Sequence, residues 1–379
     1  MAATVRRVAL NALFLAPGET GGPETYLRGL VPALASEFPD VRFELFTTRL
    51  GARALRADGW EEMVAVHELP CDEGQRGPRT IAEQILLPAR VRRARFDVLH
   101  SLGSVAPIRA LVPAVITVHD LTFVRLRTFG AVTTFGMRQV VGRAARNAEA
   151  IVTISAVARD EICDLLSIEP ARVAVVHHGA GRPPSAAATS AEVLRARYDL
   201  DGGPLVLCVA SKRPHKNQEL LVRALLDRAL PDGTVLVLAG HPEPYDAELR
   251  ALADRLGVAG RVRFADYVPD ADLEGLWRLA SVAAFPTRAE GFGLPVVEAL
   301  ARGVPVACSD LPVLREVGGE HVRVFHPDDP AGAARTIASL MSDPPDPAAG
   351  RGWAAQFTWQ AAARRTFEAY ERAVAARGR

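Results

Sequence analysis

The chain has 379 residues, enough for two domains, and its 49% hydrophobic and 23% charged content is that of an ordinary globular protein. A net charge of +1 gives no overall field toward nucleic acid or an anionic membrane, and no apolar run reaches the roughly 18 residues of a membrane span. The four cysteines are far apart and form no CxxC pair, which indicates reduced core thiols of a cytoplasmic protein rather than disulfides or a zinc site.

Short apolar runs alternate with helical patterns along the first half of the chain. The first run follows Arg6 and Arg7, and we interpret it as a strand that leads into a glycine loop, not as a signal peptide. The strands expected here lie at residues 5–15, 41–47, 96–100, 113–118, 150–154 and 173–177. Continuous apolar strands between helices predict a parallel sheet covered on both faces, as in a doubly wound α/β domain.

A Pro- and Ala-rich stretch at residues 181–189 predicts a linker to a second domain of the same kind. Its expected strands lie at residues 205–210, 234–239, 262–265, 282–285, 304–308 and 322–325. Residues 357–374 repeat apolar side chains at three- and four-residue spacing, which predicts a final amphipathic helix with Thr358 as its N-cap. We therefore expect one domain at residues 1–182 and another at residues 186–357.

Lys212 and Lys216 are the only lysines among 45 basic residues, and both lie in the loop that follows the strand at 205–210. A lysine ammonium is a compact charge that suits a phosphate oxygen, and a loop between a strand and a helix is a common phosphate site. The alternative is a solvated loop that kept its lysines by chance in a composition shaped by high-GC codon bias.

The most specific pattern lies between Phe285 and Pro305. An apolar strand ends, a Gly-Phe-Gly turn follows, and Pro295 marks the first turn of a helix. Backbone N–H groups at such a turn can hold an anion. Glu290 and Glu298 flank the turn, and their carboxylates can accept hydrogen bonds from vicinal hydroxyls of a ribose or a pyranose. Glu298 taken alone is explained as well by the helix dipole.

The string from Glu290 to Glu298, Glu-Gly-Phe-Gly-Leu-Pro-Val-Val-Glu, resembles the two-glutamate motif of retaining GT-B glycosyltransferases of family 4, which include mannosyl- and glucosyltransferases. Four further segments match that family: the glycine loop 18–26, the histidine segment 117–121, the Pro-His-Lys-Asn loop 207–217 and the segment 264–273. The resemblance implies two Rossmann-like doubly wound domains facing across a cleft. The N-terminal domain would bind the acceptor and the C-terminal domain the nucleotide sugar, with helix 358–379 packing back on the N-terminal domain.

The resemblance also implies roles for the matching residues. His119 and Glu290 would contact the donor sugar, and Lys216 would neutralise the diphosphate together with either Lys212 or Arg213. Glu298 would hold the ribose. The remaining donor contacts would come from backbone groups of Gly21, Gly22, Tyr267, Val268, Gly291, Phe292, Gly293 and Leu294.

The implied reaction is a retaining transfer of a hexose-type sugar from a nucleoside-diphosphate sugar to the hydroxyl of a small-molecule, glycan or lipid-linked acceptor in a bacterial cytoplasm. No cofactor and no metal are expected, because we interpret Asp270 and Asp272 as capping and dipole residues of a helix, not as metal ligands. The same fold also permits a pseudo-glycosyltransferase, a nucleotide-sugar epimerase or hydrolase, or a non-catalytic nucleotide-sugar-binding module.

Two further groups have alternative interpretations. His100 ends a strand and is either a core residue or part of the acceptor side, whereas the pair of His177 and His178 is interpreted as structural. Acceptor contacts are expected from the loops at 70–80 and 121–135. An arginine cluster is interpreted as a solvated helix end, with a membrane-surface patch as the alternative because some relatives act on lipid-linked acceptors. The cluster comprises Arg90, Arg92, Arg93 and Arg95.

Overall fold

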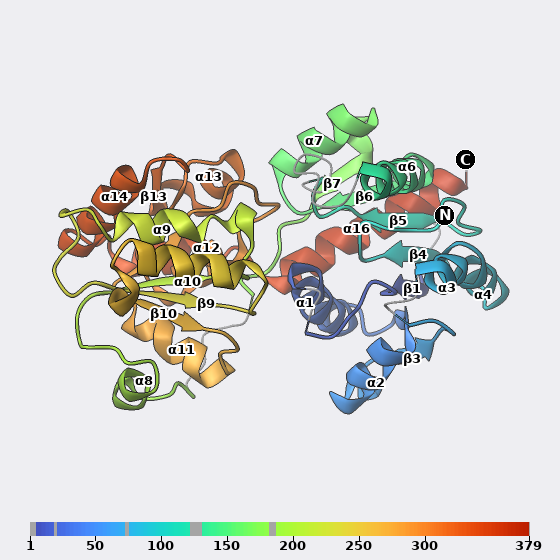
Figure 1. The fold of residues 1–379 in the computed structure, drawn as a ribbon. Helices are drawn as coiled ribbons and strands as arrows, with labels where there is room; N and C mark the ends of the chain where they lie inside the picture. The colour runs from blue at the N-terminus through green and yellow to red at the C-terminus, as the bar shows by residue number, and fades with distance from the viewer. Residues whose placement is uncertain (1–4, 19–20, 73–75, 122–130, 182–186, 379) are drawn as a thin grey trace. The chain divides into compact units, whose positions relative to one another are not determined.

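The computed structural model describes residues 5–18, 21–72, 76–121, 131–181 and 187–378 (Figure 1). The chain forms two compact units. The N-terminal unit comprises Met1–Gly179 and Phe357–Arg379, and the C-terminal unit comprises Ala180–Gln356. Among the described residues, no helix is both long enough and apolar enough to cross a bilayer.

The N-terminal unit is built on a parallel sheet of seven strands in the order β3-β2-β1-β4-β5-β6-β7. The strands are β1 (Arg7–Asn11), β2 (Arg42–Thr47), β3 (Ala65–Glu68), β4 (Val98–Ser101), β5 (Ala114–Thr117), β6 (Ala150–Thr153) and β7 (Val173–Val175). The helices are α1 (Gly22–Glu37), α2 (Arg49–Ala57), α3 (Arg76–Ile81), α4 (Leu87–Arg93), α6 (Ala131–Asn147), α7 (Ala156–Leu166) and α16 (Trp359–Arg377), with a π-helical turn at Ala82–Leu86. The apolar strands are buried on both faces, as the sequence predicts.

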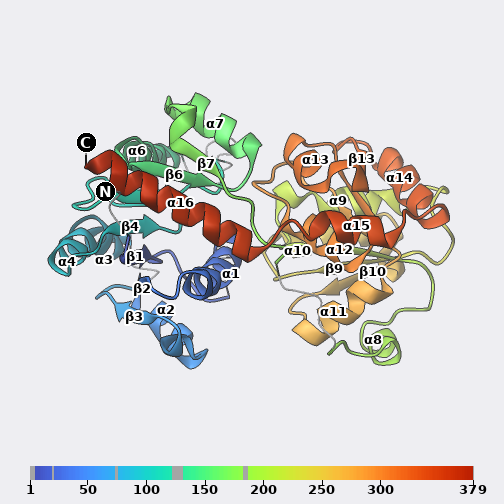
Figure 2. The same ribbon diagram turned by 180° about the vertical axis from the view of Figure 1, so that it is seen from behind.

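The final helix α16 belongs to the N-terminal unit, where it lies beside α1 (Figure 2). Thr358 is its N-cap and accepts a hydrogen bond from the backbone N–H of Ala361, as predicted. The indole of Trp359 packs directly on two glycines. A Cβ on Gly29 would lie 2.1 Å from the indole, and a Cβ on Gly179 would lie 2.6 Å from it. Both positions therefore need glycine, because the ring occupies the space of a side chain.

The C-terminal unit has a parallel sheet of six strands in the order β10-β9-β8-β11-β12-β13. The strands are β8 (Leu205–Val209), β9 (Val235–Ala239), β10 (Val262–Ala265), β11 (Val282–Phe285), β12 (Val306–Ser309) and β13 (Val322–Phe325). The helices are α8 (Ala191–Arg197), α9 (Gln218–Ala224), α10 (Tyr245–Arg255), α11 (Asp270–Leu279), α12 (Leu294–Arg302), α13 (Pro312–Gly318), α14 (Pro330–Ser342) and α15 (Pro347–Ala354). This unit is also a doubly wound α/β layer structure.

All twelve expected strands are present, most of them shorter at one or both ends than the apolar runs. The short strand β3 was not expected. Part of the expected linker, residues 182–186, lies outside the described residues. The same holds for residues 73–75 and 122–130, which belong to the loops expected to contact the acceptor.

Candidate active site

A pocket of about 310 Å³ lies at the carboxyl ends of β8 and β11. These two strands are neighbours in the sheet, and the chain continues from β8 to one side and from β11 to the other. Doubly wound sheets bind ligands outside the strand ends at such a switch point. The pocket is lined by residues of both strands, their loops, α12 and α13, namely Cys208, Val209, Ala210, Lys216, Phe285, Pro286, Thr287, Glu290, Gly293, Pro295, Val296 and Leu314.

Lys216 and Glu290 meet in this pocket. The Lys216 Nζ donates to Glu290 Oε2 at 2.6 Å, and both side chains are about one-fifth exposed. The pocket also contains the thiol of Cys208, and burial raises its pKa to about 12. The thiol is therefore neutral near pH 7, which leaves the paired Lys216 ammonium and Glu290 carboxylate as the charged groups of the pocket lining.

Backbone hydrogen bonds hold the Pro-His-Lys-Asn loop against the segment after β11. The carbonyl of His215 accepts from the N–H of Arg288 at 2.8 Å and from the Thr287 hydroxyl at 3.1 Å. Asn217 adopts a left-handed conformation (φ 57°), and its Nδ2 donates to the carbonyl of Pro286 at 2.9 Å. These contacts fix Lys216 beside Glu290, although 74 residues of chain separate the two.

Helix α12 begins at the rim of the same pocket, as the Gly-Phe-Gly pattern predicts. Gly293 precedes it with φ 97°, and a Cβ there would lie 2.6 Å from Leu314. No side chain caps the helix start, and Pro295 stands in the first turn. The positive end of the helix dipole therefore adds to the charge of Lys216 and favours an anion at this rim. Glu298 lies one turn into the helix, where its carboxylate abuts Gly181.

The structure separates Lys212 from this pocket. Its side chain is 0% exposed, and its Nζ donates to the carbonyl of Gly240 at 2.8 Å and to Asp266 Oδ1 at 3.1 Å. Arg213 is exposed and donates to Glu243 Oε1 at 2.6 Å and 2.8 Å through two nitrogens. Lys212 is thus a structural ammonium that joins three loops at the carboxyl edge of the sheet, and Arg213 is the more accessible of the two cations.

The other residues of the C-terminal unit that the resemblance assigns to the donor lie at the same sheet edge. Tyr267 follows β10 and is 82% exposed, and Val268 is half-buried next to it. Gly291 and Phe292 are buried between Glu290 and α12, and Leu294 is the first residue of that helix.

Asp272 is engaged in a structural network. Its Oδ1 accepts from the Thr189 hydroxyl at 2.6 Å, and its Oδ2 accepts from the Tyr198 hydroxyl at 2.9 Å and from Arg197. The aspartate therefore ties α8 to α11. The expectation that these aspartates cap the helix is wrong in one respect, since Pro269 is the N-cap residue and no side chain caps α11. Asp329, in contrast, caps α14 by accepting from the N–H of Gly332 at 2.9 Å.

In the N-terminal unit, Gly21 and Gly22 stand at the start of α1, and Gly21 has φ 67°, a conformation that favours glycine. His119 follows β5 and is 8% exposed. Its Nε2 lies 3.0 Å from the carbonyl of Leu102, so this nitrogen carries the proton and Nδ1 is an acceptor. Burial lowers the pKa of His119, which is therefore neutral near pH 7.

A buried network surrounds His119 that the sequence patterns did not reveal. The ring of Tyr26 meets His119 edge-on at 4.9 Å and stacks on His178 at the same centroid distance. The Tyr26 hydroxyl is 3.0 Å from Thr117 Oγ1, which is 2.7 Å from His100 Nε2. His100 Nδ1 in turn lies 2.8 Å from the hydroxyl of Tyr370 on α16. The structural interpretation of His178 and the core alternative for His100 thus fit the structure.

These buried histidines make stability depend on pH. Burial lowers the pKa of His100 to about 3 and that of His178 well below its ordinary value. Below about pH 6.5 these histidines bind protons in the unfolded chain but not in the folded chain. The free energy of unfolding that they contribute is therefore fully present above that pH and is lost as the pH falls below it. We expect a loss of roughly 1.4 kcal/mol per pH unit for each such histidine between about pH 6 and about pH 4.

Urea unfolding at a series of pH values measures this slope. The variant His100→Gln should flatten it, whereas His241→Gln, a change at an exposed histidine of the C-terminal unit, should leave it as it is. A slope that is equal in the wild type and in His100→Gln would contradict the assignment of His100 as a neutral core residue.

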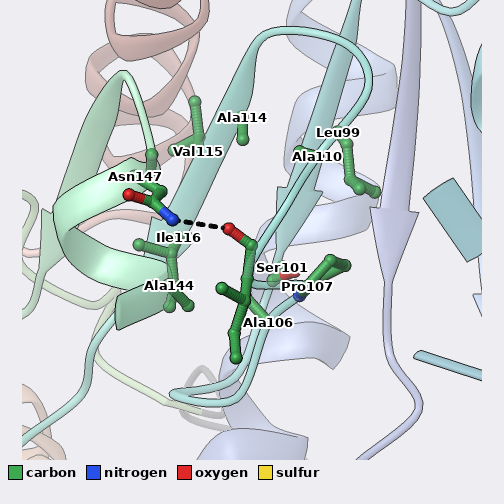
Figure 3. Close-up of a pocket in the computed structure, with 12 residues that line it drawn as sticks. Leu99, Ser101, Ala106, Pro107, Ala110, Ala114, Val115, Ile116, Ala144 and Asn147 are labelled. Atoms are coloured by element: carbon green, nitrogen blue, oxygen red, sulfur yellow. Dashed lines mark hydrogen bonds between the residues drawn. The ribbon is translucent and has the colours of Figure 1, made fainter. Parts of the chain in front are cut away.

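A second pocket, of about 280 Å³, lies in the N-terminal unit between β4, β5 and α6 (Figure 3). Its lining is mainly apolar, and its two polar side chains form hydrogen bonds with other parts of the protein. Asn147 Nδ2 donates to the carbonyl of Ile108 at 2.8 Å, and Ser101 Oγ lies 3.1 Å from Asn11 Nδ2. With no charged group in its lining, this pocket offers less for a charged substrate than the pocket of Lys216 and Glu290.

Models of known protein families match both units of the chain. The glycosyltransferase family 4 model matches residues 20–180, and the model of group 1 glycosyl transferases matches residues 191–351. The D-inositol 3-phosphate glycosyltransferase of Salinispora arenicola is 31% identical, with 98% of this chain and 93% of that protein covered. O-antigen chain mannosyltransferase B of Escherichia coli is 33% identical over 235 residues, which cover 59% of this chain and 61% of that protein.

Solved structures agree on the fold. Sucrose-phosphate synthase from Thermosynechococcus elongatus superposes with a TM-score of 0.73 at 21% identity, covering 96% of this chain and 98% of that chain. Anabaena HepE in complex with UDP and glucose superposes with a TM-score of 0.69 at 20% identity, and the match covers 98% of this chain and 97% of that chain. With two doubly wound parallel sheets, a pocket at the switch point of the second and these matches over both units, the chain belongs to the GT-B glycosyltransferases of group 1 and family 4 and is a transferase enzyme.

Proposed function

We propose that the enzyme transfers a hexose-type sugar from a nucleoside-diphosphate sugar to an acceptor hydroxyl with retention of configuration. The observation that carries this proposal is the contact of Lys216 with Glu290 beside the uncapped start of α12. The ammonium and the helix dipole are suited to a diphosphate, and the carboxylate is suited to hydroxyls of the sugar. Anabaena HepE binds UDP and glucose, which supports a uridine nucleotide as the first donor to test.

In the proposed reaction, the bond between the sugar's anomeric carbon and the β-phosphate oxygen breaks. The acceptor oxygen forms its bond to that carbon on the same face, and the departing phosphate oxygen takes the acceptor proton. No side chain becomes a covalent nucleophile. Lys216, assisted by Arg213, would stabilise the charge that develops on the diphosphate, which is where catalysis gains most. Glu290, Glu298 and the neutral His119 would orient the sugar and the ribose.

Thermal unfolding in the presence of UDP-, GDP- and dTDP-sugars tests the donor assignment, because a ligand that binds the folded state raises the melting temperature. We expect one of these nucleotide classes to raise it, and the failure of all of them would contradict the proposal. Analysis of the product then separates transfer from the alternatives. A glycoside with the donor's anomeric configuration supports the proposal, whereas free sugar, an epimerised nucleotide sugar or a non-glycosidic link supports an alternative on the same fold.

The reaction is expected to proceed without a metal ion. Lys216 and the start of α12 would supply positive charge to the diphosphate, with Arg213 as the proposed second cation, and Asp272 is committed to three protein partners. Treatment with a chelator should therefore leave the transfer rate unchanged. A loss of activity that added Mg²⁺ or Mn²⁺ restores would show instead that a divalent cation takes part.

A further inference from the structure

The linker at residues 181–189 begins against a side chain that the proposed reaction uses. Gly181 is half-buried in the C-terminal unit, and a Cβ on it would lie 2.0 Å from Oε1 of Glu298 and 2.8 Å from its Cδ. Such distances leave room only for the hydrogen atom of a glycine between the backbone of Gly181 and the carboxylate. The carboxylate that would hold the ribose is therefore in direct contact with the start of the linker.

Gly181 needs to be glycine for two separate reasons. Its φ is 61°, a left-handed conformation that other residues adopt only at a cost, and the carboxylate of Glu298 fills the place of a side chain. Gly257 of the same unit has a similar φ of 68°, but the space beside it holds no other described heavy atom within 4 Å. Gly257 thus serves a turn alone, whereas Gly181 also serves a close approach to Glu298.

The backbone of Glu298 is fixed independently of the linker. Glu298 lies on α12 between Val297 and Ala299, which are both 0% exposed, and its carbonyl accepts from Arg302 Nη1 at 3.1 Å. Arg302 is itself held by an ion pair with Glu274 at 2.9 Å. A group pushed against Glu298 would therefore rotate its flexible side chain rather than shift the helix. The direction of the carboxylate thus depends on the space that Gly181 leaves.

The place of Glu298 in the helix favours a role in binding. It is the fifth residue of α12, and the first turn of this helix contains no acidic residue. The helix dipole stabilises a carboxylate mainly within the first turn, so Glu298 gains little from it. A linker that needed only a packing partner would be better served by an apolar side chain, because a covered carboxylate loses hydration. Neither the dipole nor packing accounts for the carboxylate at this contact.

We propose that Gly181 is a positioning residue for the ribose of the donor. The proposal rests on the proposed function, in which Glu298 holds that ribose. By leaving the carboxylate its place, Gly181 keeps it in the direction that accepts hydrogen bonds from two vicinal hydroxyls. A side chain at position 181 would turn the carboxylate away, whereas the contact of Lys216 with the diphosphate would remain. Gly181 thereby selects ribonucleotides over 2′-deoxyribonucleotides.

Calorimetric titration of the full chain with UDP and with 2′-deoxy-UDP tests this proposal, with the corresponding pair of guanine nucleotides used if GDP gives the larger thermal shift. We expect the wild type to prefer the ribonucleotide by about tenfold or more, since a carboxylate left without its hydroxyl partner loses a charge-assisted hydrogen bond. Gly181→Ala should weaken ribonucleotide binding by about the same factor and leave 2′-deoxyribonucleotide binding nearly unchanged. In steady-state transfer, the KM for the donor should rise while kcat stays close to that of the wild type.

Gly257→Ala is the matched control, because it introduces the same backbone strain in the same unit without a contact to Glu298. This variant should keep the preference for the ribonucleotide. The background Glu298→Ala removes the carboxylate that a side chain at position 181 would displace. In that background Gly181→Ala should cause no further loss of affinity, so the effects of the two substitutions should not add.

Thermal unfolding of the same variants keeps the proposal testable if Gly181→Ala does not fold. The double variant Gly181→Ala with Glu298→Ala should then recover the folded protein, and its failure to do so would contradict the contact. An equal loss of affinity for both nucleotides in Gly181→Ala would overturn the proposal. A Gly181→Ala protein that keeps the ribose preference, while Glu298→Ala loses it, would overturn the role of Gly181 alone and leave the proposed function standing. A wild type that binds neither pair of nucleotides would contradict the proposed function, and the role of Gly181 with it.

Discussion

Replacing Lys216 by alanine is expected to reduce sugar transfer by roughly 100- to 1000-fold or more, because the diphosphate would lose the cation nearest to the charge it develops. The Lys216 side chain is about one-fifth exposed and contacts Glu290 at the pocket wall, not in the core. We therefore expect the melting temperature to remain close to that of the wild type. Steady-state rates with a saturating donor, measured beside thermal unfolding, check both parts of this expectation.

The same substitution also leaves Glu290 without its cation, and this carboxylate could repel the diphosphate. The double variant Lys216→Ala with Glu290→Gln removes that repulsion and separates the two effects. If Lys216 acts directly on the diphosphate, the double variant is far slower than Glu290→Gln alone. Recovery of transfer in the double variant, or normal turnover in the single one, would remove Lys216 from the proposed mechanism.

The second lysine should behave in the opposite way. Lys212→Ala removes a side chain that is 0% exposed and deprives Asp266 and the Gly240 carbonyl of their donor. We expect the free energy of unfolding to fall by about 2–4 kcal/mol, through the cavity and the lost hydrogen bonds, while donor affinity is retained. Urea unfolding and donor titration well below the melting temperature measure the two quantities.

Lys212→Met serves as the control, because methionine fills most of the space of the lysine stem without its ammonium. A smaller loss of stability than in Lys212→Ala would assign part of the effect to packing and the remainder to the two hydrogen bonds. A stable Lys212→Ala protein that no longer binds the donor would instead make Lys212 the phosphate contact.

The sheets could be predicted from the sequence because their strands are continuous apolar runs between helices. The strand β3 was missed, since Ala65-Val66-His67-Glu68 ends in polar residues and lies at the sheet edge. Its pairing depends on β2, 23 residues earlier in the chain, where Glu44 Oε2 lies 2.7 Å from His67 Nε2. The π-helical turn at Ala82–Leu86 was equally hidden, because one extra residue in a helical turn leaves no pattern in the sequence.

The motif around Glu290 predicted the helix start, the glycine turn and the place of Lys216, all of which the structure brings into one pocket. The motif could not predict which of Lys212 and Arg213 is buried, since the sequence shows only two adjacent cationic residues in one loop. The burial of Lys212 depends on Gly240, whose missing side chain lets the loops approach so closely that a Cβ there would lie 2.2 Å from the Ala210 carbonyl. Their close approach encloses Lys212.

The network of Tyr26, Thr117 and His100 could not be predicted either, because it joins three segments through side chains that have no sequence spacing in common. The roles of His119, Gly21 and Gly22 in the reaction remain predictions from the resemblance. The structure adds that the Nδ1 of His119 is a hydrogen-bond acceptor, which fits a hydroxyl donor such as a sugar.

The burial of Lys212 has a consequence for chemical labelling. The chain has only two lysine side chains, and one of them is sealed from solvent. An amine-acylating reagent therefore meets, apart from the α-amino group, a single reactive lysine, Lys216, at the wall of the candidate donor pocket. A fluorophore or an isotopic tag can be placed there without mutagenesis. Protection of this one amine by a nucleotide would report occupancy of the pocket directly, even before any acceptor is known.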